Sequence, residues 1–290
     1  MSLGTLLITG AAGMLGQRAA ADAAAAGWTV VGTDLGGAEV ELDLTDAQAT
    51  ASTVASIMPS AVIHCAAFVD VDGAEEREGV AFAVNGDASG NLARACQMIG
   101  ARLVAVSTDY VFDGELRGRP YLESDPTAPL GAYGRTKLAG EQAIASETGD
   151  YVIARTAWLF GWPGKSFPDT MLRAGAARGE VAVVTDQVGS PTWTGHLSQA
   201  LVSLASGSIT GVVHTAGGGQ CSWHELTVEL YRQAGLDVIV NETDSTAFVR
   251  PAPRPAWSVL ATERAEEGAP VLPDWREGVA GYLAERGDQA

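Results

Sequence analysis

The stretch that most constrains the fold lies near the N-terminus, where an apolar run meets a glycine-rich loop. Residues 5–9 read as a short buried strand, Gly10-Ala-Ala-Gly13-Met-Leu-Gly16 follows, and an alanine-rich helical segment closes at Gly27. Strand, glycine loop and helix in this order begin a dinucleotide-binding unit. The glycines let backbone N–H groups approach a pyrophosphate, and the helix N-terminus adds partial positive charge. A tight turn with close helix–strand packing is the alternative.

The second apolar run, residues 29–33, ends at Asp34. A carboxylate at the end of the second strand can accept hydrogen bonds from both ribose hydroxyls and would repel a 2′-phosphate. Asp34 therefore favours NADH over NADPH as the cofactor.

The remaining apolar runs set the fold class. Runs at 61–67, 102–106 and 151–154 alternate with helical segments. This alternation predicts an α/β fold of the Rossmann type, with a doubly wound parallel sheet and right-handed crossovers. We expect residues 1–157 to form the dinucleotide-binding domain, rejoined by parts of 181–216. Residues 158–290 are expected to form mainly a smaller C-terminal substrate-binding domain.

A tyrosine and a lysine follow the fourth strand at a spacing that would bring a phenol and an ammonium together for proton transfer. Ser107 and Thr108 lie at the C-terminal end of that strand, where open α/β sheets bind ligands. Tyr133 and Lys137 would share one face of a helix. A cation some 4 Å away contributes roughly 4 kcal/mol at an effective dielectric constant of about 20, enough to lower a phenol pKa of about 10 by nearly three units. The alternative is an ordinary surface pair on an amphipathic helix.

Charge and composition exclude several classes of protein. The chain has 35 acidic against 18 basic residues and a net charge of −17, which disfavours a general nucleic-acid binder. Three scattered cysteines without a CxxC pattern suggest neither a disulfide framework nor a zinc site. No signal peptide is recognisable, and the alanine-rich stretch at 19–26 is too short to cross a bilayer, so we expect a cytoplasmic protein without membrane association.

Three further features have structural interpretations. His64 lies inside an apolar run, so we expect a core histidine. The acidic cluster Glu75, Glu76 and Glu78 reads as a solvated helix start, with a metal site as the alternative. The tryptophans of the C-terminal part, Trp223 among them, are expected to pack in the core or between domains.

Six segments together carry a family resemblance. They are Gly10-x-x-Gly13-x-x-Gly16, Ala66-Ala67-Phe68 through Asp72, Ser107-Thr-Asp-Tyr-Val-Phe-Asp-Gly114, Tyr133-Gly-Arg-Thr-Lys137, Arg155-Thr-Ala-Trp158 and Asp186-Gln-Val-Gly-Ser-Pro-Thr192. With these segments the chain resembles the extended short-chain dehydrogenase/reductase family and, within it, the dTDP-4-dehydrorhamnose reductases. The resemblance covers nearly the full chain.

The resemblance implies a reaction and a set of roles. Hydride would pass from NADH or NADPH to the 4-keto group of a dTDP-linked deoxysugar, dTDP-4-dehydro-L-rhamnose, giving dTDP-L-rhamnose. Tyr133 would be the general acid, Lys137 would bind the nicotinamide ribose, and Thr108 would hold the carbonyl oxygen. The substrate would contact Thr108, Asp109 and Trp158, with Arg254 as a candidate for its diphosphate; a loop salt bridge is the alternative for Arg254.

The resemblance also implies a cofactor lining and a possible metal. The lining would comprise Gly10, Gly13, Met14, Leu15, Asp34, Asp43, Leu44, Ala66, Ala67, Phe68 and Val69, with Tyr133 and Lys137. Some family members bind Mg²⁺ through acidic residues at a homodimer contact. Here Gln17 and Arg18 stand where one such residue is expected, which argues against the metal and against metal-linked dimerisation.

Two alternatives remain open at this level. One is another nucleotide-sugar 4-ketoreductase or an epimerase on the same fold. The other is a non-catalytic NAD(P)-binding regulatory subunit, which the presence of Thr108, Tyr133 and Lys137 disfavours, because binding alone needs no proton donor.

Overall fold

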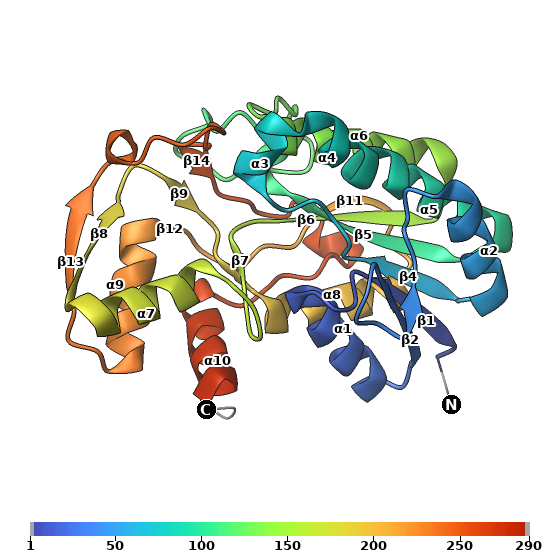
Figure 1. The fold of residues 1–290 in the computed structure, drawn as a ribbon, viewed down its shortest axis with the longest axis horizontal. Helices are drawn as coiled ribbons and strands as arrows, with labels where there is room; N and C mark the ends of the chain where they lie inside the picture. The colour runs from blue at the N-terminus through green and yellow to red at the C-terminus, as the bar shows by residue number, and fades with distance from the viewer. Residues whose placement is uncertain (1–2, 288–290) are drawn as a thin grey trace.

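The computed structural model describes residues 3–287 and is built on a seven-stranded sheet in which every neighbouring pair of strands is parallel (Figure 1). The strand order is β11-β6-β5-β4-β1-β2-β3. The strands are β1 (Thr5–Thr9), β2 (Thr29–Asp34), β3 (Val40–Glu41), β4 (Ala61–His64), β5 (Arg102–Thr108), β6 (Tyr151–Thr156) and β11 (Gly211–His214). The predicted Rossmann-type sheet is confirmed.

Helices cover both faces of this sheet because its strands are apolar on both sides. Leu6 and Ile8 of β1 pack in one core cluster, whereas Leu7 between them packs in another. The first cluster includes residues of α1 and α8, and the second includes residues of α2, α5 and α6. These helices are α1 (Met14–Ala25), α2 (Ala47–Ile57), α5 (Ala88–Ile99), α6 (Ala132–Glu147) and α8 (Thr194–Ser206).

The order of the strands reverses between β1 and β4. From β1 the chain builds outward through β2 and β3, then returns to β4 on the other side of β1 and builds outward again through β5 and β6. Ligands of open α/β sheets bind outside the carboxyl ends of the strands at such a switch point. The glycine loop after β1 and the segment after β4 flank it.

A second lobe has its own core and lies on the left in Figure 1. Its strands β8 (Glu180–Val184) and β13 (Ile239–Thr243) pair in parallel. Its core includes Leu172, Leu226, Leu230, Trp275 and Tyr282. The surrounding helices are α7 (Phe167–Arg178), α9 (Trp223–Ala234) and α10 (Trp275–Gly287).

Short elements join the two lobes. The strand expected near 212–214 is β11, which pairs with β6 and so returns to the main sheet. The domain limits at 157 and 158 stay a prediction. Further short elements are α3 (Val71–Glu76), α4 (Glu78–Phe82), β7 (Leu159–Phe160), β9 (Val188–Gly189), β10 (Thr192–Trp193), β12 (Cys221–Ser222) and β14 (Trp257–Ser258).

Candidate active site

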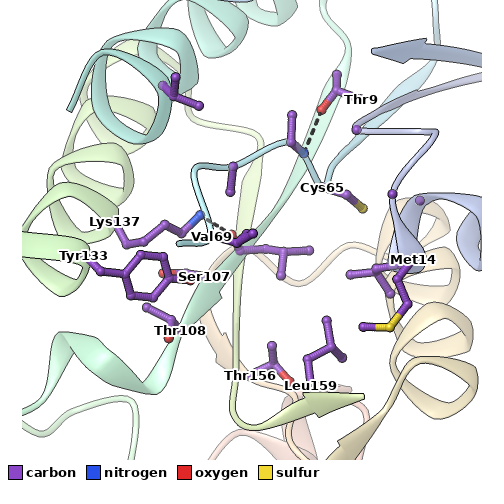
Figure 2. Close-up of a pocket in the computed structure, with 18 of the residues that line it drawn as sticks. Thr9, Met14, Cys65, Val69, Ser107, Thr108, Tyr133, Lys137, Thr156 and Leu159 are labelled. Carbon is purple, nitrogen blue, oxygen red and sulfur yellow. Dashed lines mark hydrogen bonds between the residues drawn. The ribbon is translucent and has the colours of Figure 1, made fainter. Parts of the chain in front are cut away.

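A cavity of about 670 Å³ opens at the carboxyl ends of the central strands. Its walls come from the glycine loop, the ends of β2, β4, β5 and β6, and the start of α6. In Figure 2, Tyr133, Lys137 and Thr108 lie on one side of it and Met14 lies opposite. Of the predicted site residues, Gly10, Gly13, Met14, Leu15, Asp34, Asp43, Leu44, Ala66, Ala67, Val69, Thr108, Asp109, Tyr133, Lys137 and Trp158 line it.

Close backbone packing explains the glycines of the loop. Gly10 has a φ of +67°, and a Cβ there would lie 2.6 Å from the Ala66 backbone nitrogen. A Cβ on Gly16 would lie 2.1 Å from the Gly10 carbonyl oxygen. The loop therefore lies directly against the end of β4, with the N-terminus of α1 at the cavity wall. This is a cradle that suits a pyrophosphate.

The Asp34 carboxylate is held in place beside that loop. Its Oδ2 accepts a hydrogen bond from the Ala12 backbone N–H at 3.0 Å, and its Oδ1 accepts one from the Leu35 N–H at 2.8 Å. Both bonds orient the carboxylate toward the part of the cavity next to the glycine loop. The position fits the ribose-binding role that the sequence predicts, which remains a prediction.

The start of α6 brings Tyr133 and Lys137 to the end of β5. Lys137 Nζ donates to the Val106 carbonyl oxygen at 2.8 Å, and Tyr133 forms a side-chain hydrogen bond with Thr108. Thr108 Oγ1 also donates to Asp109 Oδ1 at 3.0 Å. The hydroxyl of Thr108 and the phenol of Tyr133 can thus both reach one oxygen atom placed between them and the cavity.

Burial sets the electrostatics of this pair. It lowers the pKa of Lys137 to about 8, although the nearby Glu141 carboxylate opposes the shift. Burial, with the Asp109 carboxylate as the second cause, raises the pKa of Tyr133 to about 12. The expectation that the pKa of the phenol is lowered is therefore wrong for this structure, because burial and the Asp109 carboxylate raise it.

Burial also shifts the pKa values of Asp109 and His64. The Asp109 side chain is buried, and this raises the pKa of its carboxyl to about 6 despite a hydrogen bond from Ser258. Burial lowers the pKa of His64 to about 3, and the ring is bonded to Thr9 at 2.7 Å and to Ser89 at 3.2 Å. The expectation of a satisfied core histidine is confirmed.

A second cavity of about 500 Å³ adjoins the first. Both are lined by Trp158 and Trp223, whose rings stack with centroids 3.5 Å apart. Trp158 has a φ of +47°, and a Cβ on Gly189 would lie 2.4 Å from its indole, which explains the glycine in the 186–192 loop. Arg254 lines the second cavity.

Comparison with known proteins decides the family. Residues 4–287 match the family described as RmlD substrate binding domain. The chain belongs to this family.

Three proteins similar to this chain are named as reductases of dTDP-linked compounds. A dTDP-4-dehydrorhamnose reductase of Mycobacterium tuberculosis is 42% identical over 286 residues, covering 96% of this chain and 92% of the relative. A probable dTDP-4,6-dihydroxy-2-methyloxan-3-one 4-ketoreductase of Streptomyces antibioticus is 40% identical, covering 94% and 92%. The structure of a dTDP-4-dehydrorhamnose reductase from Bacillus anthracis in complex with NADP matches with a TM-score of 0.93 at 35% identity, covering 98% of this chain and all of that one.

Some positions of this RmlD-family chain differ from the sequence expectations. Phe68 does not line the first cavity; its ring packs near Ala74, Ala81 and Ala132 instead. Arg254 forms an ion pair with Asp72 at 3.0 Å, so the alternative of a salt bridge is present at the edge of the second cavity.

Sequence reasoning missed two residues of the site. Trp223 was expected to pack in the core or between domains, with no place in the site; α9 of the second lobe carries it to Trp158, and it lines both cavities. Lys165, in the loop after β7, also lines both cavities. The only signal for Lys165 was its position between Gly164 and an N-cap serine, which indicates a loop.

The described residues hold no candidate metal-binding cluster and no helix that could span a membrane. Residues 3–287 contain no group of three or more His, Cys, Asp or Glu side chains arranged to hold a metal ion, the 75–78 cluster included. Arg18 is bonded to Asp22 at 3.0 Å and to Glu285 at 3.1 Å. Across the described chain, every helix is too short or too polar to traverse a bilayer.

Proposed function

We propose that this protein reduces the 4-keto group of dTDP-4-dehydro-L-rhamnose to give dTDP-L-rhamnose. It is an NAD(P)H-dependent oxidoreductase of the dTDP-4-dehydrorhamnose reductase type, as its family and its relatives indicate. The observation that supports the chemistry most directly is the convergence of Thr108, Tyr133 and Lys137 on one wall of the cavity at the switch point. A bound reduced nicotinamide supplies the hydride.

The polar groups at the end of β5 orient the carbonyl that accepts the hydride. The Tyr133 phenol can donate to this carbonyl oxygen, and Thr108 Oγ1 can donate to the same atom once its single hydroxyl proton turns away from Asp109 Oδ1. Two donors on this oxygen stabilise the negative charge that grows as the carbonyl is reduced. Tyr133 then transfers its proton to the oxygen and becomes a phenolate.

Lys137 balances the charge that this proton transfer leaves behind. Its ammonium is buried and donates to the Val106 carbonyl, one turn of helix from Tyr133. A cation at this position stabilises a phenolate within the low-dielectric cavity. The lysine thus acts on the product of the proton transfer, while the phenol of the free enzyme stays protonated.

The adjoining cavity suits the nucleoside diphosphate part of the substrate. Arg254 brings a guanidinium to its wall, and Trp158 with Trp223 supplies an aromatic wall toward the reacting carbon. Guanidinium groups bind diphosphate oxygens by charge-assisted hydrogen bonds. We assign Arg254 to the diphosphate and Asp109 with Trp158 to the sugar.

The proposed cofactor is NADH or NADPH, with a preference for NADH. The preference is supported by Asp34, whose fixed carboxylate would repel a 2′-phosphate. The structure of the Bacillus anthracis relative is a complex with NADP, so the phosphorylated cofactor stays a candidate here. A homodimer and a bound Mg²⁺ are further proposals from the family resemblance, and the Arg18 guanidinium beside Asp22 and Glu285 speaks against the metal at that contact.

One relative favours a specific second candidate. The Streptomyces antibioticus protein is named a probable 4-ketoreductase of a different dTDP-linked sugar, and it is nearly as similar as the rhamnose enzymes. A 4-ketoreductase for another dTDP-deoxysugar would use the same Thr108, Tyr133 and Lys137. An epimerase differs in that it retains tightly bound NAD⁺.

The test is oxidation of NADH, and then of NADPH, by the purified protein with freshly prepared dTDP-4-dehydro-L-rhamnose. We expect prompt oxidation and dTDP-L-rhamnose as the product identified by NMR. Oxidation only with another dTDP-4-keto sugar would favour the second candidate. NAD⁺ carried through purification, with no net oxidation, would favour an epimerase and contradict the proposal.

A further inference from the structure

Glu141 and Arg155 form a buried ion pair near the first cavity, and the proposed mechanism assigns no role to either residue. The Glu141 carboxylate accepts from Arg155 Nη2 at 2.7 Å and from Arg155 Nε at 3.0 Å. The two side chains are only 6% and 5% exposed. Burial of two full charges is costly, and such pairs are often replaceable by apolar residues without loss of stability. A structural role alone therefore explains this pair poorly.

The Glu141 carboxylate connects α6 and β5, which carry Tyr133, Lys137 and Thr108, with the neighbouring strand β6. Glu141 follows Lys137 by one turn on α6, so both side chains share a face of the helix. Ser107, the residue before Thr108 on β5, donates its hydroxyl to Glu141 Oε1 at 2.5 Å. Arg155 lies directly opposite Ser107 on β6. One carboxylate thus ties α6 to the ends of both strands.

Among the titratable groups around Lys137, Glu141 is the anion that balances its charge, because His64, Cys65 and Tyr133 are neutral. Lys137, Glu141 and His64 line a common internal cavity of about 10 Å³, too small to hold another side chain. From β4, His64 stays neutral because burial lowers its pKa to about 3, and Cys65 stays a thiol because burial raises its pKa to about 12. Tyr133 on the same helix is likewise protonated.

We propose that Glu141 is a positioning residue of the reaction, which holds Lys137 in its charged form and fixes the end of β5 that carries Thr108. Arg155 pairs with the carboxylate and holds it where it accepts from Ser107. This inference rests on the proposed function only for its kinetic readout, because the charge state of Lys137 can be measured without substrate.

The lysine content of the chain makes that measurement direct. Lys137 and Lys165 are the only lysines in the sequence. Protein labelled with ¹³C-lysine therefore gives two sets of side-chain signals, of which the exposed Lys165 is an internal reference. Substitution of Lys165 by arginine assigns the two sets.

The decisive variant is Glu141→Gln, which keeps the size of the side chain and removes its charge. We expect the pKa of Lys137 to fall by about half a unit or more, with the Lys165 signals the same as in the wild type. At saturating cofactor, the alkaline limb of the kcat/KM profile should move in the same direction and by a similar amount. Glu147→Gln, at the exposed end of the same helix, is the matched control and should change neither quantity.

A second variant separates the charge from the stability of the fold. Glu141→Leu with Arg155→Met replaces the whole pair by apolar side chains and leaves no unpaired buried charge. The pKa of Lys137 should again fall. An unmoved Lys137 pKa in either folded variant overturns the inference about Glu141. If the wild-type protein does not oxidise NADH with this substrate, but the pKa of Lys137 still falls in the Glu141 variants, the proposed function is overturned and the inference about Glu141 stands.

Discussion

Tyr133 and Lys137, the proposed general acid and its balancing cation, are both buried, and burial shifts both pKa values in the direction of the neutral side chain. The pKa of Tyr133 is raised to about 12, so the phenol is fully protonated in the free enzyme at neutral pH. A general acid needs its proton available, and an alkoxide formed by hydride addition is a stronger base than this phenolate. Proton transfer from Tyr133 therefore stays favourable once the carbonyl is reduced.

Removal of the Tyr133 hydroxyl should abolish turnover without affecting cofactor binding. We expect Tyr133→Phe to lower kcat by about 100-fold or more, because the general acid is lost. The dissociation constant for NADH, measured by fluorescence titration, should change little. Tyr151→Phe at the start of β6, outside the cavity, should retain full activity. A kcat for Tyr133→Phe near that of the wild type would disprove the role of the phenol.

The charge of Lys137 should set the alkaline limit of activity. An ammonium is charged below its pKa, and burial lowers the pKa of Lys137 to about 8. We therefore expect kcat/KM to fall as the pH rises through about 8, because the neutral amine cannot stabilise the phenolate. A profile that stays flat up to about pH 10, the range of an unperturbed lysine, would contradict this.

Asp34 is the residue at which cofactor choice can be tested. Asp34→Ala removes the carboxylate proposed to bind the ribose and takes away the acceptor of the Ala12 and Leu35 N–H groups. We expect the ratio of kcat/KM for NADH to that for NADPH to fall by about tenfold, equivalent to about 1.4 kcal/mol. An unchanged ratio would mean that Asp34 does not read the 2′ position.

At the scale of elements, the loop between β1 and α1 depends on contacts that only glycine allows. Gly16→Ala would place a Cβ 2.1 Å from the Gly10 carbonyl oxygen, so loop and helix must move apart. Overpacking of this kind costs about 1–3 kcal/mol, and the loop would lose its fit to a pyrophosphate. We expect a lower melting temperature and a cofactor affinity reduced by about tenfold or more.

Gly79→Ala is the matched control for this substitution. Gly79 lies in α4, and a Cβ there meets no atom within 4 Å. Alanine is favoured over glycine inside a helix by about 0.5–1 kcal/mol. We therefore expect unchanged cofactor affinity and equal or higher stability. Equal melting temperatures and equal cofactor affinities of the two variants would show that the close contact between Gly16 and Gly10 does not require glycine.

The elements of the main sheet could be predicted from sequence because each depends on a local pattern. The apolar run at 102–106 lies within β5, and the run at 61–67 begins with β4, which ends at His64. The positions of Trp223 and Lys165 could not be predicted. Both depend on how the second lobe packs against the first, which no local pattern records.

At the scale of the whole molecule, ion pairs and an aromatic stack join the lobes around the adjoining cavities. Asp72 at the start of α3 forms ion pairs with Arg254 at 3.0 Å and Arg250 at 3.4 Å. The Trp158–Trp223 stack joins the end of β6 to α9. Pairs so far apart in sequence explain why the second cavity was absent from the sequence interpretation, although Trp158 and Arg254 were named individually.

The second cavity should govern substrate affinity separately from cofactor affinity. Arg254→Gln removes the guanidinium assigned to the diphosphate, a charge-assisted contact of about 1.5–3 kcal/mol. We expect KM for the dTDP-sugar to rise by about tenfold or more, with the NADH dissociation constant unchanged. Arg232→Gln, an exposed arginine paired with Glu229 on α9, should leave both constants unchanged. A rise in both constants for Arg254→Gln would refute the division between the cavities.

The most direct test of the account follows the hydride itself. The wild-type protein is incubated with NADH deuterated at the transferable position of the nicotinamide and with dTDP-4-dehydro-L-rhamnose, and the sugar product is examined by NMR and mass spectrometry. The account predicts dTDP-L-rhamnose with one deuterium at C4 and with an ordinary solvent-derived proton on the new hydroxyl. A product without deuterium at C4, or no reduction of this sugar by a protein that binds NADH, would contradict it.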